Sequence, residues 1–86
     1  MEELIDVTEF YMFKTEEDAR KILDCMIQVA EEYGIVTKAD FKDLINRNSK
    51  YEESIHGWVG DVIKKARVVP TEFGYFIEFP RAVSFV

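Results

Sequence analysis

The sequence has few of the residues on which disulfide-rich, metal-binding and loop-rich proteins depend. Its 86 residues include one cysteine, one histidine, two prolines and four glycines. A single cysteine excludes an internal disulfide and any site built from several cysteine ligands. No apolar run approaches the roughly 20 residues that a transmembrane helix needs. Three of residues 1–6 are acidic, which is not typical of a secretory signal peptide. We therefore expect a soluble protein of a reducing cytoplasm.

Basic residues are also scarce. Eleven lysines and arginines stand against 17 aspartates and glutamates, which gives a net charge of −6. Residues 1–37 carry −7, residues 38–67 carry +2 and residues 68–86 carry −1. Overall acidity disfavours non-specific binding to nucleic acid or anionic lipid. The mildly basic middle is the part of the chain where that conclusion could fail.

Apolar and aromatic residues are plentiful for so short a chain. They make up 48% and 14% of the residues, while charged residues make up 33%. That balance indicates a folded protein rather than a disordered one. A chain of this length forms one domain with one modest core, so we expect a single domain over residues 1–86.

Two helices are predicted by their start and stop signals. Thr15 is a suitable N-cap for a helix over residues 15–33, acidic residues fill its first turn, and Gly34 follows as a left-handed C-cap. Thr37 begins a second helix over residues 37–46. Its third position is acidic, and a hydrophobic staple is available across its first turn. The connection is so short that we expect the two helices to turn sharply against each other.

The remaining segments are predicted from weaker patterns. Residues 7–13 read as a strand, residues 46–53 as a polar loop, and residues 58–66 as a short third helix despite a glycine within it. A hairpin follows, with arms at residues 67–70 and 74–79. Its turn is expected at Pro70–Gly74, Pro80 is expected to end the pairing, and residues 82–86 form an apolar tail.

Together these elements predict an α+β fold, with two N-terminal helices packed on a small antiparallel sheet built around the C-terminal hairpin. The order of two helices, a short third helix or turn and a hairpin is also that of a winged helix. The residues expected in the core are Ile22, Leu23, Met26, Ile27, Ala30, Phe41, Leu44, Ile45, Trp58, Val62, Ile63, Ile77 and Phe79.

The second half of the chain contains the motifs His56-Gly57-Trp58, Ala66-Arg67-Val68, Gly74-Tyr75-Phe76-Ile77 and Phe79-Pro80. With these motifs the sequence resembles a group of small, uncharacterised phage and prophage proteins. In the first half the resemblance rests on residues 13–19 and 33–37, and it covers roughly residues 8–82. The sequence departs from the pattern at Phe79, in place of leucine, and at Ala82, in place of proline. The resemblance implies a phage or prophage origin, hence a bacterial host cytoplasm, and no particular activity.

No residue pattern points to catalysis, a metal or a cofactor. Cys25 and His56 are the one thiol and the one imidazole, and nothing in the sequence places them together. Carboxylates occur in adjacent runs, and adjacent residues on a helix point apart, so these runs do not form an acid–base pair. The chain contains neither a calcium-binding loop of the EF-hand type nor a glycine-rich phosphate loop. We therefore expect a protein that is not an enzyme, with no catalytic, metal-binding or cofactor-binding residues.

Two hypotheses about function remain. The first is a phage-type accessory protein that binds a protein partner or itself through the apolar residues near either terminus. The second is a winged-helix-like DNA-binding regulator, favoured by the element order and disfavoured by the charge. Its phosphate-contacting residues would be Lys64, Lys65, Arg67, Arg47 and Lys50. Neither hypothesis involves a membrane or a small-molecule substrate.

Overall fold

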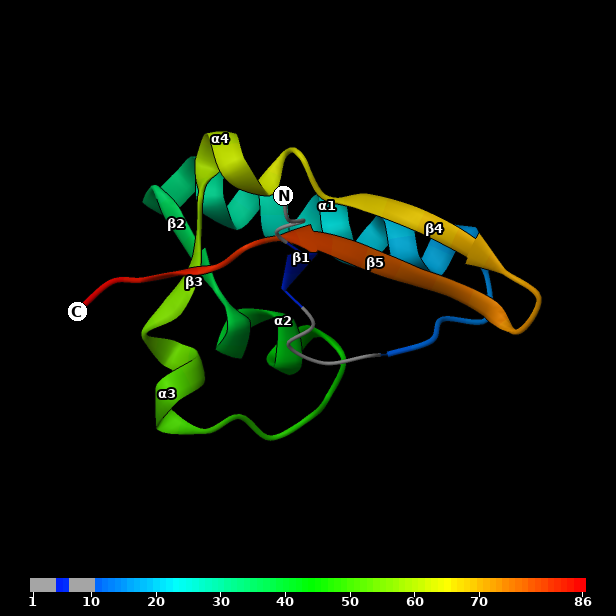
Figure 1. Cartoon of the computed structure of the whole chain (residues 1–86), viewed down its shortest axis with the longest axis horizontal. Coiled ribbons are helices and arrows are strands. Elements are labelled where there is room, and N and C mark those ends of the chain that lie inside the picture. The colour runs from blue at the N-terminus through cyan, green and yellow to red at the C-terminus, as the bar shows by residue number, and fades with distance from the viewer. Residues whose placement is uncertain (1–4, 7–10) are drawn as a thin grey trace.

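The computed structural model describes residues 5–6 and 11–86, with side chains described from residue 11 onward. Within this part of the chain, helices combine with two three-stranded antiparallel sheets, ordered β1-β5-β4 and β2-β3-β6. The predicted α+β class and the C-terminal hairpin are therefore confirmed. Figure 1 shows the hairpin running along α1 on one side of the molecule, with α2 and α3 on the opposite side.

Helix α1, Glu16–Tyr33, forms where its end signals predict it. The hydroxyl of Thr15 accepts a hydrogen bond of 3.0 Å from the backbone N–H of Asp18, which caps the first turn. At the other end Gly34 has φ 88°, and its N–H donates to the carbonyl of Ala30 at 2.7 Å. Glycine adopts this left-handed conformation without steric cost, so the helix ends cleanly.

Helix α2, Lys38–Leu44, is shorter than the expected 37–46, since Thr37 is its N-cap and Ile45 its C-cap. The capping box is complete: Asp40 N–H donates to the Thr37 hydroxyl at 3.1 Å, and Thr37 N–H donates to the Asp40 carboxylate at 2.9 Å. The connection between the helices is not merely a turn. Residues Ile35–Thr37 form strand β2.

The polar segment 46–53 was expected to be a loop throughout, and this is corrected in its second half. Residues Tyr51–Ser54 form α3, a single helical turn. Its N-terminus is closed by Glu53, whose carboxylate accepts a 2.7 Å hydrogen bond from the N–H of Lys50.

The third helix expected over residues 58–66 is also corrected. Residues His56–Val59 form strand β3, and the helix that follows, α4, spans only Gly60–Ile63. Four residues rise about 6 Å along a helix axis. The regularly spaced apolar residues that predict one longer helix are instead divided between strand β3 and the single turn of α4.

The hairpin consists of β4, Arg67–Thr71, and β5, Gly74–Pro80. Both prolines differ from expectation. Pro70 pairs with Tyr75 inside the ladder, so the turn is only two residues long, and Pro80 pairs with Ile5 of β1, Ile5–Asp6, instead of ending the sheet. Proline is tolerated at both positions because β4 lies at the edge of its sheet and Pro80 is the last residue of β5.

The expected N-terminal and C-terminal segments have different outcomes. The strand expected over residues 7–13 lies mostly outside the described residues. Of the described part, Phe13 makes an isolated bridge with Tyr75. The tail at 82–86 contains β6, Val83–Ser84, which pairs with β3.

The core lies between α1, the hairpin and the smaller sheet. Eight of the expected core residues are fully buried, and the other five are half-buried against them. The fully buried residues that were expected are Leu23, Met26, Ala30, Phe41, Trp58, Ile63, Ile77 and Phe79. Four further buried residues complete the core: Phe13, Ala19, Val36 and Ala66.

Candidate functional site

The smaller sheet, β2-β3-β6, carries exposed apolar side chains on two neighbouring strands. Its register pairs Ile35 with Val59, Val36 with Trp58, and Gly57 with Val83. Because successive residues of a strand point to opposite faces, each pair belongs to one face of the sheet. One face therefore turns toward the core and the other away from it.

The inner face is fixed by Trp58. Its indole is 1% exposed and stacks on Phe79, with ring centroids 4.8 Å apart and an angle of 20° between the rings. The indole Nε1–H donates a hydrogen bond of 2.7 Å to the carbonyl of Pro80. Val36, opposite Trp58, is also fully buried. These contacts hold the sheet in one orientation, and they therefore also determine which side chains lie on its outer face.

The outer face carries Ile35, Val59 and Val83, with Thr37 and Gly57 among them; we call this set the valine face. Val59 is 41% exposed and Val83 is 51% exposed, while Ile35 is half-buried. On adjacent strands, Val59 and Val83 are diagonal neighbours, a spacing at which side chains of two strands belong to one surface. The valine face is thus an apolar surface that no other described element covers completely.

Gly57 determines how closely the strands approach within this face. A Cβ atom at this position would lie 2.1 Å from the carbonyl oxygen of Val36 and 2.6 Å from the Cα of Thr37. Both are backbone atoms of β2, so neither can move aside alone. Any side chain larger than hydrogen would therefore push β2 away from β3.

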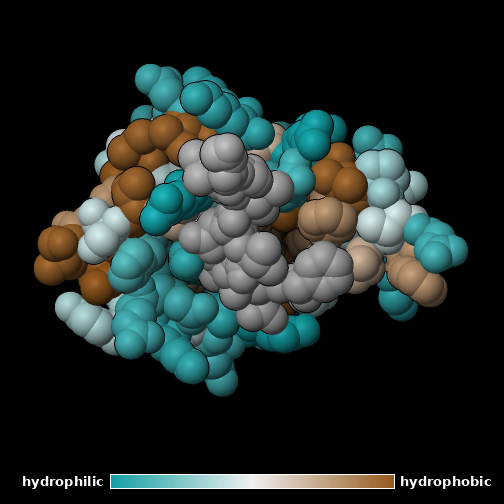
Figure 2. All heavy atoms as spheres, in the orientation of Figure 1, coloured by the Kyte–Doolittle hydropathy of each residue, from teal (hydrophilic) through white to brown (hydrophobic). Residues whose placement is uncertain are grey.

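Further exposed apolar side chains lie near the same end of the molecule. Tyr33, the last residue of α1, is 73% exposed and stands two residues before Ile35; Val86 is 88% exposed. Figure 2 shows brown, hydrophobic side chains gathered at the left end, where Figure 1 places β2, β3 and the C-terminal segment. Isolated apolar side chains are common on protein surfaces, whereas a group of them is typical of an interaction site.

The residues proposed for DNA contact lie in two separate regions. Lys64, Lys65 and Arg67 follow α4, at the top of Figure 1, whereas the loop holding Arg47 and Lys50 lies at the bottom. Two of the first group are engaged by carboxylates. The Nζ of Lys64 is 3.3 Å from Glu31, and the Nε of Arg67 donates to Glu78 at 2.7 Å. Lys65 is exposed.

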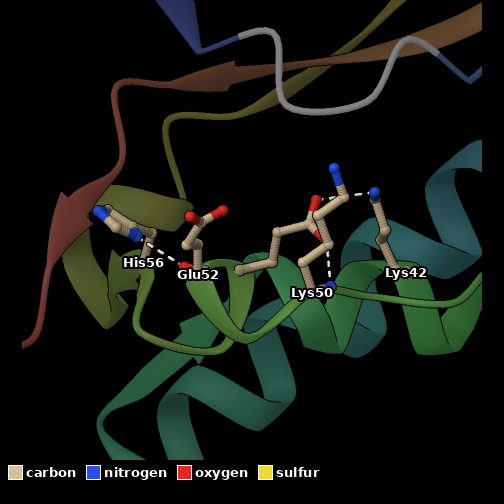
Figure 3. Close-up of polar contacts among 5 residues, drawn as sticks. Lys42, Lys50, Glu52 and His56 are labelled. Atoms are coloured by element: carbon tan, nitrogen blue, oxygen red, sulfur yellow. Dashed lines mark hydrogen bonds and ion pairs between the residues drawn. The ribbon is translucent and has the colours of Figure 1, made fainter.

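In the second region, the guanidinium of Arg47 lies over the ring of Tyr11, 5.2 Å from its centroid. Lys50 is exposed and precedes α3, which is tied to α2 by an ion pair of 2.7 Å between Lys42 and Glu53 (Figure 3). The side chains of this pair are 13% and 15% exposed. The hydrogen-bonded Lys42 lowers the pKa of Glu53, and partial burial opposes that effect. This pair has a structural role, since it fixes α3 against α2.

Cys25 and His56 are not joined by any contact in the described part of the chain. Cys25 is half-buried on α1. The Nδ1 of His56 lies 2.7 Å from the carbonyl oxygen of Glu52 in the preceding helical turn (Figure 3). Over residues 5–6 and 11–86 there is no group of three or more metal-ligating side chains.

Two open pockets lie beside α1. One, of about 270 Å³, lies between α1 and the end of α2, and its lining includes Tyr11, Lys21 and Ile45. The other, of about 320 Å³, lies on the helix surface beside Cys25 and Asp24. Neither brings together residues with a recognisable catalytic relationship. Among the described helices, none is long and apolar enough to cross a membrane.

Comparison of the chain with protein-family models, with curated proteins and with solved structures gives no match in any of the three.

Proposed function

We propose that this chain is a non-enzymatic accessory protein of the phage or prophage type, which acts in the bacterial cytoplasm by binding a protein partner. The observation that carries the proposal is the exposure of Val59 and Val83 on one face of an ordered sheet. Burying apolar surface is the main source of free energy in protein association, at roughly 25 cal/mol per Å². The valine face is the surface of the described residues best suited to provide it.

The fixed orientation of the valine face also supports the proposed binding of a protein partner. Trp58 and Val36 are fully buried on the other side of the same strands, so the valine face is presented on a rigid backing. A pre-organised surface loses less conformational entropy on binding than a mobile one. The face also combines branched apolar side chains with open strand backbone, which are the two features that partner strands recognise.

The DNA-binding alternative receives less support. A winged helix needs a third helix that fills the major groove, whereas α3 and α4 have four residues each. Lys64 and Arg67 already contact carboxylates, and Arg47 and Lys50 lie on the other side of the molecule. The net charge of −6 opposes approach to a polyanion.

Affinity capture from bacterial cells tests the proposal when matched surface variants are compared. The wild-type chain and the double variant Val59→Asp/Val83→Asp are each used as bait, and bound proteins are quantified by mass spectrometry. Both substituted side chains are exposed, so the variant should fold. We expect one protein to be retained by the wild type and lost, by at least about tenfold, with the double variant.

The control is Phe73→Asp. Phe73 is 80% exposed at the turn of the hairpin, so this variant removes an equally apolar side chain from a different part of the surface. Retention of the partner by Phe73→Asp supports the valine face. Equal loss of the partner protein in both variants, or its loss in Phe73→Asp alone, would contradict the valine face as the binding surface.

A further inference from the structure

Strand β4 is the longest edge strand among the described residues, and one of its two edges is open. The order β1-β5-β4 places it at the margin of the larger sheet (Figure 1). It has five residues, whereas the edge strands β2 and β6 of the smaller sheet have three and two. Strands of globular proteins are usually about five or six residues long, so this edge is long enough to pair with another strand.

The hydrogen bonds of Tyr75 show which backbone groups of β4 face outward. The N–H of Tyr75 donates to the Phe13 carbonyl at 2.8 Å, and the Tyr75 carbonyl accepts from the Phe13 N–H at 2.6 Å, so both groups point away from β4. Pro70, opposite Tyr75, therefore makes no ladder hydrogen bond to β5, and by alternation neither does Val68. The N–H of Val68 and the carbonyls of Val68 and Pro70 point toward the open edge. Among the described residues, no hydrogen bond engages these three groups.

We propose that the open edge of β4 pairs with β4 of a second copy of this chain, antiparallel and about a two-fold axis. The pairing joins the two larger sheets into one continuous sheet. A two-fold interface uses the same residues on both copies, so every contact across it is made twice. This surface is separate from the valine face, which belongs to the smaller sheet. The inference therefore goes beyond the proposed function and does not depend on it.

Pro70 restricts the register of this pairing. Proline at an edge removes a donor and so excludes pairings that need its N–H. When Val68 of one copy lies opposite Pro70 of the other, the Val68 N–H donates to the Pro70 carbonyl, and the two-fold axis gives two such bonds. The same register places the half-buried Val69 opposite its own counterpart and Arg67 opposite Thr71. A register centred on Val68 would instead place the two arginines diagonally across from each other on one face, where like charges repel.

The charges at the two ends of β4 are complementary in an antiparallel pair. Lys65, two residues before β4, and Glu72, directly after it, are both exposed, and neither forms an ion pair among the described residues. The neighbouring cations Lys64 and Arg67 already contact carboxylates of their own chain. In the proposed register Ala66 lies opposite Glu72 of the second copy, so Lys65 reaches that carboxylate. The two-fold axis forms this ion pair at both ends of the interface.

The net charge of −6 is carried mainly by another part of the chain. Residues 1–37 carry −7, whereas residues 64–78, which include β4 and most of β5, hold three basic and two acidic residues. On the neighbouring α1, Glu16 pairs with Arg20 at 4.0 Å. Charges farther apart than about 8 Å are largely screened at physiological ionic strength. A strand of uniform charge would complement only one end of β4, whereas a second copy complements both, so the charges favour a second copy.

Sedimentation of the full chain from about 10 µM to about 1 mM, in about 150 mM salt, tests the proposal. We expect a monomer at the lowest concentration and a dimer at the highest. Lys65→Glu and Glu72→Lys each place like charges at both ends of the interface, so each should weaken dimerisation about fivefold or more. The double variant Lys65→Glu/Glu72→Lys restores opposite charges and should dimerise as the wild type does. Both side chains are exposed, so all three variants should fold.

Amide hydrogen exchange, followed by NMR, tests the backbone pairing itself. The N–H of Val68 is open to solvent in the monomer and hydrogen-bonded in the dimer. The N–H of Val69, which is opposite Phe76, faces β5 in both states and is the internal control. Between about 50 µM and about 1 mM protein, we expect exchange at Val68 to slow about threefold or more and exchange at Val69 to stay unchanged.

The remaining outcomes separate this inference from the proposed function. A chain that stays monomeric at about 1 mM overturns the pairing of β4 and leaves the valine face untouched. A dimer that neither single charge reversal weakens, or one in which exchange at Val68 does not slow, also overturns it. We expect Val59→Asp/Val83→Asp to dimerise as the wild type does. Loss of the dimer in that variant, with no effect of the charge reversals, would assign self-association to the valine face instead.

Discussion

The indole Nε1–H of Trp58 donates a hydrogen bond of 2.7 Å to the carbonyl oxygen of Pro80. Trp58 belongs to β3 of the smaller sheet, and Pro80 is the last residue of β5 in the larger one. The stacking of Trp58 on Phe79 strengthens the same junction. One side chain thus joins the two sheets, and the orientation of the valine face depends on it.

Trp58→Phe should destabilise the protein by about 2–3 kcal/mol, because it leaves the Pro80 carbonyl without its donor and leaves a void in the core. Chemical denaturation followed by far-UV circular dichroism measures this change, since Trp58 is the single tryptophan and its fluorescence disappears with it. A loss below about 0.5 kcal/mol would show that the junction contributes little.

Gly57→Ala should destabilise the protein by more than about 2 kcal/mol, because the added Cβ overlaps two backbone atoms of β2. Gly60→Ala is the matched control. A Cβ there would lie 3.7 Å from the nearest atom, the Ala30 carbonyl oxygen, which is an ordinary contact. We expect Gly60→Ala to be neutral or slightly stabilising, since alanine favours helix more than glycine does. Equal effects of the two substitutions would contradict the close approach of β2 and β3.

Because of the ion pair between Lys42 and Glu53, the free energy of unfolding depends on pH in the acidic range. The hydrogen bond from Lys42 lowers the pKa of Glu53 in the folded state below its usual value of 4.5, so the folded state holds this proton less tightly than the unfolded state. The stabilisation is complete above the unfolded pKa and is lost as the pH falls through the folded pKa. Glu53→Gln should therefore cost about 1 kcal/mol at neutral pH, and the difference from wild type should shrink below pH 4.5.

Urea denaturation of both proteins at neutral pH and near pH 3 tests this dependence. The far less buried pair of Arg20 with Glu16, at 4.0 Å, serves as the control. Glu16→Gln should change stability by a few tenths of a kcal/mol at most. A Glu53→Gln deficit that stays constant with pH would show that the charge of Glu53 is not the cause.

Signals close together in the sequence predicted the helices well. The caps at Thr15, Gly34 and Thr37 each act within four residues, so the residues that end α1 and begin α2 can be read directly from the sequence. The hairpin was found for the same reason, because its two arms are adjacent in the chain. These elements account for most of the predicted core.

The smaller sheet was not predicted, since its pairing depends on contacts between distant residues. Strands β2 and β3 have three and four residues, too short for a pattern of alternation. Trp58 and Val59 also fit a helical spacing with Val62, which favoured a helix. Gly57 was the available signal, because an interior glycine often marks a close approach of backbone.

The candidate site could not be predicted for the same reason, because it depends on the pairing of β3 with β6. The sequence places Val83 in an apolar tail and Val59 in the short helix expected over residues 58–66. Their exposure on one face follows only from the register that pairs Gly57 with Val83. The charged residues, by contrast, were visible in the sequence, but their carboxylate partners Glu31 and Glu78 were not.

Duplex DNA should not bind at about 100 µM protein in about 50 mM salt, because the candidate cations are divided between two regions of an acidic molecule. Fluorescence anisotropy of a labelled mixed-sequence duplex, repeated at about 200 mM salt, measures this. Salt-sensitive binding that is lost in Lys64→Ala/Lys65→Ala/Arg67→Ala would favour the winged-helix alternative over a protein partner.

Photo-crosslinking in living bacteria tests the valine face most directly. p-Benzoylphenylalanine is placed in turn at Val59, at Val83 and at Phe73, all of which are exposed. We predict that residues 59 and 83 give an adduct with the same partner protein after irradiation and that residue 73 does not. An adduct formed from residue 73, with none from residues 59 and 83, would contradict the valine face as the binding surface.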